Sequence, residues 1–444
     1  MKNRKRDIYS PPAKAMQEEL RTRQYVKYQN NAANAYYCGR SAGNNNKSNS
    51  YPVLPFYEFP KDCTREYVTI QELYDAYYDC RKHKRNKKSA LKFEMEYEKE
   101  LIRLHNELNG GIYEISPSIV FCVTRPKTRE VFAADFRDRV VHHLLMRRFE
   151  YMFESEMIDS SYNCRKNKGV LYGVFDTERQ MREVSMSYTR EAYILQCDIK
   201  GFFMSISREK MWDMVESTLR KNYHEDDLYF WLWLWQKVIL HQFEKNCRIC
   251  GDRSLLDKLP PHKSILKSKG MGLPIGNVPS HYLSNLYLTI FDKWAVSYLD
   301  RDGRYGRYAD DWHAMHPDKD KLLNMISDAR KFLREELSLT LHPEKIYLQE
   351  IGKGVRFCGA VIKKGRVYVS NSTLGMIYDS IDRYNKGKAS KDMLVRSINS
   401  YFGLLCHYKT YAIRWRLWKR IKDKENLCNV NMLKLKMTQN RRKS

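Results

Sequence analysis

Apolar residues are spaced as in helices over one early segment of the chain and as in strands just after it. Over residues 68–108 they recur at intervals of about 3.6 residues, which predicts amphipathic helices. The glycine pair 110–111 follows and is expected to end them. Over residues 112–136, β-branched and aromatic side chains alternate with polar ones, which predicts an antiparallel ribbon. A helix with one apolar face is expected over residues 139–152.

Two strand patterns in the middle of the chain end in carboxylates. Residues 193–197 are mostly apolar and read as a buried strand, and Asp198 follows directly. Residues 306–309 and 312–315 read as the strands of a tight hairpin, so Asp310 and Asp311 fall at its tip. A strand–helix unit followed by a hairpin can set such acids side by side on one sheet. We therefore expect the three carboxylates to converge.

The other segments are predicted from the same spacing. A glycine-rich loop over 270–277 opens onto a helix, residues 339–348 resemble a strand, residues 355–362 a hairpin, and the last 70 or so residues helices. Cys247 and Cys250 form one C-x-x-C motif without a second pair, which is weak evidence for zinc. We read this part of the chain as a loop with free thiols.

Charge and composition point to a polyanionic partner. The 444 residues include 79 Lys and Arg against 53 Asp and Glu, a formal net charge of +26. Such an excess favours a nucleic-acid-binding surface, and aromatic residues at 13% suit base stacking between phosphate contacts. The longest apolar run, residues 228–235, is too short to span a membrane and reads as a buried helix, so no membrane partner is expected.

Residues 1–66 are predicted to form a basic, flexible N-terminal extension. A block of charge opens the chain, and residues 30–50 are rich in Asn, Ala and Ser. Such a segment is either a disordered arm or an arm that grips RNA, and the two are compatible. The eleven cysteines and the lack of a secretory segment over residues 1–6 indicate a cytosolic protein with reduced thiols.

The adjacent pair Asp310 and Asp311 is the first candidate for chemistry. Neighbouring carboxylates repel each other unless a cation lies between or beside them. Mg²⁺ prefers oxygen ligands and binds carboxylates together with substrate phosphates. With Asp198 as the third ligand, the set suits two Mg²⁺ ions, with Mn²⁺ able to substitute, in phosphoryl transfer. The plainer alternative for the pair alone is a solvated surface turn.

Three side chains are candidates for nucleotide binding. Lys127 and Arg129 lie on the basic ribbon and can meet the negative charge of a triphosphate, Arg129 through bidentate contacts. A solvated strand face is the alternative for both. Phe203, five residues after Asp198, can stack under the incoming sugar and exclude a 2′-hydroxyl, or it can be ordinary core packing.

The motifs together resemble the reverse transcriptase family, with palm motifs like those of group II intron enzymes. They are Asp198-Ile199-Lys200-Gly201-Phe202-Phe203, Tyr308-Ala309-Asp310-Asp311, Leu341-His342-Pro343-Glu344-Lys345 and Val355-Arg356-Phe357-Cys358-Gly359. The resemblance implies an α+β right-hand polymerase, with fingers and palm built on antiparallel sheet over residues 67–370. A basic helical thumb and tail would cover 371–444. It also implies that Lys345 lies near the pyrophosphate and that Phe357 and Gly359 grip the primer.

A departure from the common pattern points to a subfamily. Most reverse transcriptases carry Gln after Leu-Pro, whereas this chain has Ile275-Gly276-Asn277 after Leu273-Pro274. This loop resembles reverse transcriptases of diversity-generating retroelements. The resemblance implies error-prone cDNA made from a template-repeat RNA, a basic oligomeric accessory protein, and a prokaryotic or phage-encoded, cytoplasmic enzyme. Isoleucine offers only dispersion where glutamine can hydrogen-bond near the nascent pair, so wrong pairs lose less relative to right ones.

The proposed nucleic-acid contacts follow from the same motifs. Ile275 and Gly276 would lie at the nucleotide, and Asn277 at the template and primer. Arg165 and Lys166, in a basic loop over 161–169, would also meet the template RNA or the RNA/cDNA hybrid, while dNTPs are the substrates. Two alternatives remain open within the enzyme class, a phage-defence and a group II intron-type reverse transcriptase. A non-catalytic RNA-binding protein that kept the fold is the alternative from another class.

Overall fold

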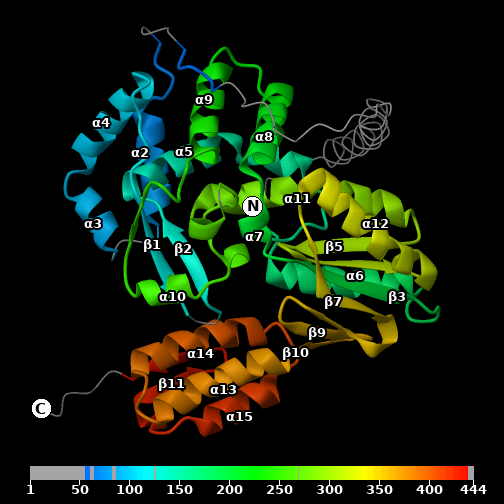
Figure 1. Ribbon diagram of the computed structural model, residues 1–444. Coiled ribbons are helices and arrows are strands. Elements are labelled where there is room, and N and C mark those ends of the chain that lie inside the picture. Colours follow the sequence, from blue (N-terminus) through cyan, green and yellow to red (C-terminus); the bar gives the residue numbers. More distant parts are fainter. Residues whose placement is uncertain (1–55, 61–64, 83–86, 125–126, 269, 439–444) are drawn as a thin grey trace, which may run out of the picture. The chain divides into compact units, whose positions relative to one another are not determined.

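The computed structural model describes residues 56–60, 65–82, 87–124, 127–268 and 270–438 (Figure 1). Most of the expected N-terminal extension, residues 1–55 and 61–64, lies outside the described residues. The chain from Phe56 onward forms one compact unit. Within the described residues, no helix combines the length and the apolar character that crossing a bilayer requires.

One group of helices packs together in this unit, as the spacing predicts. They are α2 (Ile70–Arg81), α3 (Lys88–Glu94), α4 (Tyr97–Asn109), α5 (Phe136–Glu156), α8 (Arg208–Asn222) and α9 (Leu228–Ile239). Helix α2 begins with a capping box between Thr69 and Glu72, and α4 ends at Gly110, so the predicted stop is confirmed. Helix α9 is buried over most of its length, which confirms that its apolar run belongs to the core.

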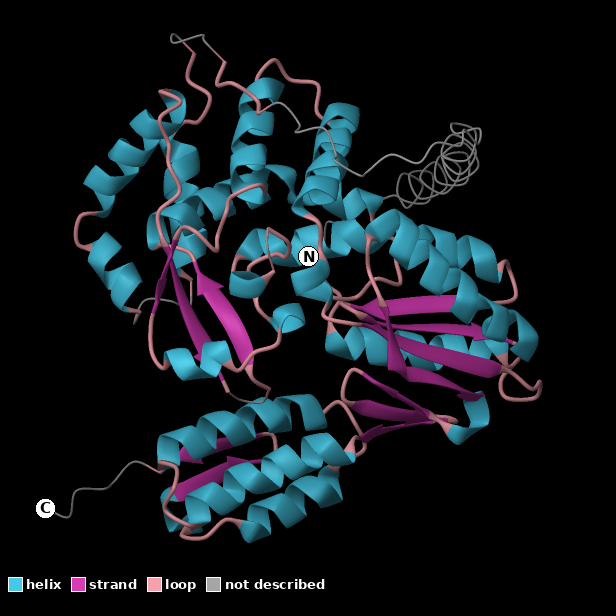
Figure 2. Cartoon of the chain, in the orientation of Figure 1, coloured by secondary structure: helices cyan, strands magenta, loops and turns pink. Residues whose placement is uncertain are grey.

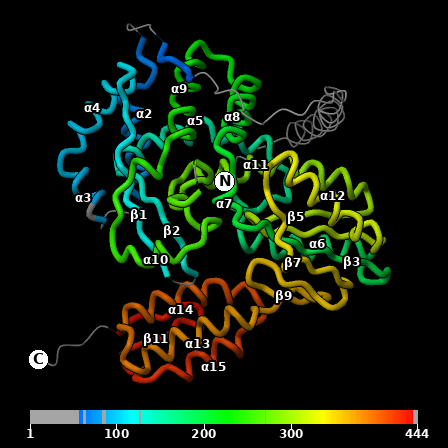
Figure 3. The backbone as a smooth tube through the Cα atoms, viewed as in Figure 1, coloured from blue at the N-terminus to red at the C-terminus, as the bar shows by residue number. Residues whose placement is uncertain are grey.

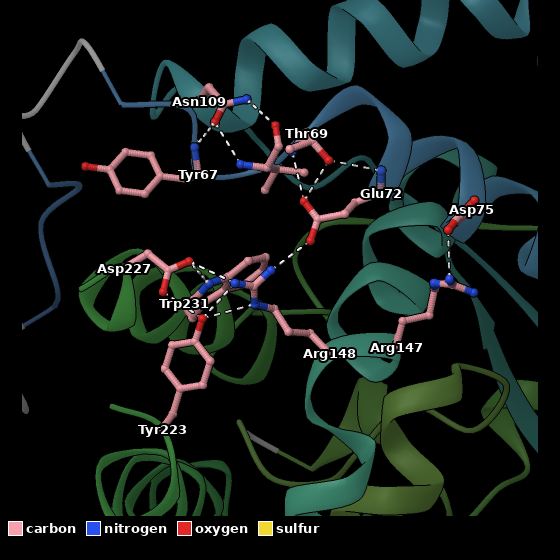
Figure 4. Close-up of polar contacts among 11 residues, drawn as sticks. Tyr67, Thr69, Glu72, Asp75, Asn109, Arg147, Arg148, Tyr223, Asp227 and Trp231 are labelled. Carbon is pink, nitrogen blue, oxygen red and sulfur yellow. Dashed lines mark hydrogen bonds and ion pairs between the residues drawn. The ribbon is translucent and has the colours of Figure 1, made fainter. Parts of the chain in front are cut away.

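One arginine ties three of these helices together (Figure 4). The guanidinium of Arg148 on α5 donates to Glu72 of α2 at 2.7 Å and to Asp227, at the start of α9, at 3.1 Å. It also lies 4.6 Å from the ring centre of Trp231. Because Arg148 is held by two carboxylates and an aromatic face, the helices are fixed in one arrangement.

The predicted ribbon forms the first sheet. Strand β1 (Ser118–Val123) pairs antiparallel with β2 (Arg129–Ala133), from Ile119↔Ala133 to Val123↔Arg129. A third strand, β4 (Cys247–Ile249), pairs parallel with β1. The prediction of a loop at Cys247 was therefore wrong, because three residues are too few to show a strand period and the pairing is with a distant edge. Cys247 and Cys250 are free thiols.

The second sheet contains, among the described residues, four antiparallel strands in the order β5-β6-β3-β7 (Figure 2). They are β3 (Tyr193–Ile199), β5 (Arg304–Tyr308), β6 (Asp311–His316) and β7 (Leu341–Glu350). Trp312 packs on Phe291 of α11 (Val278–Leu299), while the next residue, His313, bonds to Gln180 of α6 (Val170–Val184). Since neighbouring residues point to opposite faces, α11 and α6 cover opposite sides of the sheet. Helix α12 (Lys319–Leu337) also packs on it.

The chain then forms a small sheet and a helical region (Figure 3). Strands β8 (Val355–Phe357), β9 (Ala360–Lys363) and β10 (Arg366–Val369) precede α13 (Asn371–Asn385), α14 (Lys391–Leu405) and α15 (Tyr411–Arg420). A hairpin of β11 (Leu427–Val430) and β12 (Lys434–Met437) follows, where the spacing predicts only helix. One apolar core joins α6, the small sheet, the helices and this hairpin.

Short helical elements complete the described part of the chain. They are α7 (Phe202–Ser205), α10 (Arg253–Asp257) and the single-turn 3₁₀ helices η1 (Pro261–Lys263), η2 (Ile265–Lys267), η3 (Ile351–Lys353) and η4 (Lys424–Asn426). Two residues separate Ile199, the last residue of β3, from Phe202, the first of α7, and the second of them, Gly201, has a left-handed conformation. A side chain at Gly201 would stand 2.7 Å from the carbonyl oxygen of His262, so only glycine allows this close approach.

Candidate active site

Three carboxylates from two parts of the chain converge at one end of the second sheet. In the β3–β6 pairing, Asp198 stands directly opposite Asp311. The amide of Ile199 donates to the carbonyl oxygen of Asp310 at 3.2 Å, which continues the pairing into the turn. The convergence expected for Asp198, Asp310 and Asp311 is therefore present, and it follows from strand register alone.

A buried ion pair lies under the turn that carries two of these acids. Ala309 begins the turn with a positive φ of 56°. The guanidinium of Arg307, which is fully buried, donates to the Ala309 carbonyl oxygen at 2.9 Å and to both oxygens of Asp292 at 2.7 Å. It also contacts Asn285. Arg307 thus fixes the carbonyl that sets the direction of the turn.

Burial, followed by repulsion between the carboxylates, disfavours ionisation of Asp310 and Asp311. Burial raises the pKa of Asp310, and the charge of Asp198 raises it further. Burial, Asp198 and Asp310 together raise the pKa of Asp311 to about 7. The positive charges of Lys345 and Arg129 oppose the rise in the pKa of Asp310. Added cations would therefore stabilise the ionised form of these carboxylates.

Lys345 supplies one such positive charge. Its ammonium, on β7, donates to Oδ2 of Asp198 at 2.5 Å. Lys345 was expected to lie near the reacting phosphates, and this contact brings it to the carboxylate cluster. Its side chain is 47% exposed, so the ammonium has room to move toward a ligand.

The donor chemistry fits Mg²⁺, although the side chains do not stand ready to coordinate it. Carboxylate oxygens are the ligands Mg²⁺ prefers. The raised pKa of Asp311 shows that its ionised form lacks nearby positive charge, which a divalent cation would supply. In the described part of the chain, no three His, Cys, Asp or Glu side chains form a metal-binding group. Lys345 occupies one oxygen of Asp198. Ions would be held by Asp198, Asp310 and Asp311 only after that ion pair rearranges.

The basic ribbon reaches the same site. Arg129 opens strand β2, is exposed, and lowers the pKa of Asp310 through its charge, so it faces the carboxylates. Lys127 lies exposed in the bend just before β2. Arg129 is therefore within electrostatic reach of the acids, and Lys127 lies two residues before it in the chain. A triphosphate-binding role stays a prediction for both.

The glycine-rich loop joins the ribbon to the helix after Asp198. Phe132 of β2 donates to the Ile275 carbonyl at 3.1 Å, and Leu273 donates to the Phe203 carbonyl at 2.8 Å. Gly276 has a φ of +118°, and a side chain there would press on Phe132 at 3.1 Å. The loop is thus held between the two elements that bear Arg129 and Phe203.

Phe203 and its neighbour Phe202 differ in exposure. Phe202 is buried, whereas Phe203 is partly exposed and its ring lies 6.3 Å from that of His281. The side chain of Ile275 packs against an apolar cluster that includes Val120 and Phe132. Sugar selection by Phe203 and fidelity control by Ile275 stay predictions.

Three residues expected at template or primer have their side chains occupied inside the protein. Arg165 is 8% exposed and donates to the carbonyl oxygens of Ile158 and Ser161. Asn277 is 3% exposed and accepts from the Ala134 amide at 3.3 Å. Phe357 is 2% exposed and packs on the ring of His313. These side chains shape the loops around the site, and nucleic-acid contact by them stays a prediction.

Lys166 and Gly359 are placed differently. Lys166 is exposed in the loop that Arg165 holds, so its charge is available to a phosphate. Gly359 has a φ of +78° in the turn between β8 and β9, next to Cys358 at +48°. Burial and the nearby Asp311 charge raise the pKa of Cys358, which shows that this turn lies close to the carboxylates.

The buried groups that support the site were not predicted from the sequence. These are the Arg307–Asp292 pair and a buried network in which Tyr162 and Gln180 bond to Asp176 while Gln180 bonds to His313. A usable signal was present for Arg307, because a charged residue inside a strand that reads as buried needs a partner. Nothing in the spacing identifies Asp292 as that partner.

Comparison with known proteins shows which family the sequence matches. Residues 125–362 match the family described as "Reverse transcriptase (RNA-dependent DNA polymerase)". The chain is 25% identical over 249 residues to the "Putative COX1/OXI3 intron 1 protein" of Saccharomyces cerevisiae, covering 55% of this chain and 25% of that protein. It is 21% identical over 293 residues to "Protein YkfC" of Escherichia coli, covering 59% of this chain and 70% of that one. The match thus spans only a quarter of the yeast protein.

Solved structures give a more distant likeness. Apo telomerase from Candida tropicalis aligns with a TM-score of 0.44 and 9% identity, covering 69% of this chain and 61% of that chain. The same telomerase in complex with a fragment of telomeric RNA aligns with a TM-score of 0.43 and 9% identity, covering 69% and 57%.

Proposed function

Because this chain belongs to the reverse transcriptase family and has the expected α+β right-hand polymerase fold, we propose that it is an RNA-directed DNA polymerase. The observation that carries the proposal is the convergence of Asp198, Asp310 and Asp311 beside two cations, Lys345 and Arg129. Such a site suits transfer of a nucleotide from a dNTP to a primer on an RNA template.

The three carboxylates would hold two Mg²⁺ ions, with Mn²⁺ able to substitute. When bound, the ions supply Lewis-acid activation of the primer hydroxyl and stabilise the leaving pyrophosphate. Arg129 and Lys127 would neutralise the remaining triphosphate charge, and Lys345 would exchange Asp198 for a phosphate oxygen. Phe203 would lie under the sugar, where its ring leaves no room for a 2′-hydroxyl.

Primer extension by two charge-matched variants tests the catalytic assignment. Asp310→Asn removes a proposed ion ligand, and we expect extension on an RNA template to fall by about a hundredfold or more while RNA binding persists. Asp300→Asn is the control, because it removes the same charge from an exposed carboxylate that pairs with Lys321. Full activity in Asp310→Asn would contradict the role of Asp310, whereas RNA binding without extension by the wild type would support the remaining alternative, a non-catalytic RNA-binding protein on this fold.

We further propose the subtype of a diversity-generating retroelement, which makes error-prone cDNA from a template-repeat RNA. Support comes from Ile275 at the position where a glutamine is usual. The backbone of Ile275 is bonded to β2, so its replacement changes only the side chain.

Sequencing of cDNA made by Ile275→Gln tests the subtype. We expect errors opposite template adenine to fall about tenfold, because one polar contact contributes about 1–3 kcal/mol of discrimination. Ile275→Leu keeps an apolar side chain and should keep the error spectrum. Equal error rates in the wild type and Ile275→Gln would contradict the fidelity role.

A group II intron-type enzyme is the second candidate, favoured by the similarity to the yeast intron 1 protein. A phage-defence enzyme shares the same palm motifs. The wild-type cDNA separates them, since errors concentrated at template adenines belong to the retroelement type and uniform, rare errors to the others. For the retroelement type we also propose a basic oligomeric accessory protein, bridged to this basic chain by RNA, in a bacterial or phage-infected cytoplasm.

A further inference from the structure

The C-terminal region contains an aromatic cavity that the polymerase site does not use. It has a volume of about 520 Å³ and is lined by Tyr411, Trp415, Trp418, Asn429, Asn431 and Met432. The three aromatic residues follow one another at spacings of four and three on α15, so they form one stripe along that helix. The other three residues belong to the β11–β12 hairpin, Asn429 to strand β11 and Asn431 and Met432 to the turn.

The walls of this cavity are fixed by internal bonds. Arg414 of α15 donates to the Met432 carbonyl oxygen at 2.6 Å, which joins helix and turn. Leu435 of β12 donates to Asn399 of α14 at 2.7 Å, which anchors the hairpin on the helices behind it. Leu417, from the other side of α15, is fully buried. The cavity is therefore part of the folded region.

Large aromatic surfaces face outward at this site. Tyr411 is 61% exposed and Trp415 is 42% exposed. Neighbouring exposed rings of this size mark a binding surface more often than a chance feature. Stacking on a planar ligand would bury them.

An amide at the cavity offers polar recognition as well. The Oδ1 atom of Asn429 is buried and has no hydrogen-bond partner among the described residues, while its Nδ2 donates to the Met432 sulfur. A buried carbonyl without a partner is costly. An amino group at the edge of a nucleobase would satisfy it.

The charge around the cavity selects a polyanion. Residues 409–438 contain nine Lys and Arg against two acidic residues. Arg416 and Lys419 on α15 are exposed, and Lys419 lies 5.9 Å from the ring centre of Trp415. Stacking rings, a base-edge amide and phosphate-binding cations are the combination that single-stranded nucleic acid needs. In a duplex the bases are stacked on each other and cannot enter.

We propose that the cavity between α15 and the β11–β12 turn binds an unpaired base of single-stranded RNA, with the neighbouring cations on its phosphates. The site would hold an RNA segment by its bases, apart from the duplex at the carboxylates. It needs RNA as a partner but not catalysis, so it goes beyond the proposed polymerase activity.

Binding of a 12-nucleotide oligoadenylate to the full chain tests the proposal, without dNTPs or divalent cations. We expect Trp415→Ala to weaken binding by about tenfold, since stacking of one base on an aromatic ring contributes that much or more. Trp415→Phe should retain most of the affinity. Tyr151→Ala is the matched control, because Tyr151 is 64% exposed on α5, away from the cavity residues, and should bind as the wild type.

An abasic oligonucleotide identifies the group that is bound. If bases enter the cavity, an abasic ribose-phosphate strand should bind weakly to the wild type and no more weakly to Trp415→Ala. Unchanged oligoadenylate affinity in both Trp415→Ala and Tyr411→Ala would overturn the proposal, as would equal losses for duplex RNA. Either result leaves the polymerase assignment intact, because the assay contains no step of the reaction.

Discussion

Arg307 shows how one side chain positions the turn that carries Asp310 and Asp311. Its guanidinium is buried with Asp292 and holds the Ala309 carbonyl oxygen at 2.9 Å, next to the two acids. Buried ion pairs add little net stability, but removing one partner leaves an uncompensated charge. We infer that the pair is kept for the direction of the turn.

Variants of this pair separate stability from positioning. Arg307→Met should lower the free energy of unfolding by about 3–5 kcal/mol, because Asp292 stays charged and buried. Arg307→Met with Asp292→Leu should recover most of that stability and still extend primers about tenfold or more slowly, since the Ala309 carbonyl has lost its donor. Denaturant unfolding and primer-extension rates measure the two effects. Wild-type turnover in the double variant would contradict the positioning role.

Asp138 gives the chain a stability that depends on pH. It accepts from the Tyr113 hydroxyl at 2.8 Å and from the Ser116 amide at 3.0 Å, and burial raises its pKa from 3.8 to about 6. A carboxyl with a raised folded-state pKa stabilises the fold while protonated, and this stabilisation is lost as pH rises through that pKa.

The expected loss from Asp138 is about 2 kcal/mol between about pH 4.5 and about pH 7. Asp138→Asn lacks the titration, so the difference in unfolding free energy between the wild type and this variant should shift by that amount in the variant's favour as pH rises. Denaturant unfolding at several pH values measures it. A difference that stays constant with pH would show that Asp138 keeps its ordinary pKa.

The predictions for single residues succeeded where the pairing of predictable strands sets the geometry. Asp198, Asp310 and Asp311 meet because strand register brings them together, and strands are visible in the spacing. Arg165 and Asn277 are different, since a polar residue in a loop can point to a ligand or turn back to a nearby backbone group. Both turn back here, and local sequence does not encode that choice.

At the scale of elements, the loop over residues 270–277 connects the ribbon to the site through hydrogen bonds. Asn277 holds it to β2 through the Ala134 amide, beside the bond between Phe132 and Ile275. The ribbon carries Arg129, so a loosened connection would let that cation move away from the nucleotide.

Asn277→Ala should therefore raise the KM for dNTP about tenfold, because a buried amide loses its acceptor and the ribbon is less well fixed. Asn324→Ala, on the exposed face of α12, is the control and should leave the KM unchanged. Steady-state extension at varied dNTP measures both. An effect confined to RNA affinity would point instead to direct template contact by Asn277.

Long, periodic elements were predictable and short ones were not. The helices from residue 70 to 109, the buried α9 and the acidic hairpin follow from spacing and glycine positions. Strand β4 has three residues and depends on pairing with β1 from far along the chain. The β11–β12 hairpin turns at Asn431 and Met432, both with positive φ, and each of its strands has four residues. Charged and apolar residues alternate over Lys434–Met437 but not over Leu427–Val430, so only one short strand carried a local signal.

For the whole molecule, the net charge of +26 predicts strongly salt-dependent RNA binding. Each phosphate neutralised releases a counterion, so the logarithm of affinity should fall linearly with the logarithm of salt, by about 0.7 per contact for a single strand. Titrations of an RNA template between about 50 and about 200 mM salt measure the slope. A slope near zero would show that the positive charge is not used on RNA.

The ion pair between Lys345 and Asp198 has a consequence for the enzyme at rest. The Lys345 ammonium neutralises part of the negative charge of the carboxylate cluster, whose members otherwise repel one another. A preparation stripped of magnesium by a chelator should keep its palm intact, because this internal counter-ion remains. If Asp198, Asp310 and Asp311 hold divalent ions as proposed, those ions would replace the lysine as the counter-charge. The ammonium of Lys345, whose side chain is 47% exposed, would then be able to pair with a phosphate of the nucleotide.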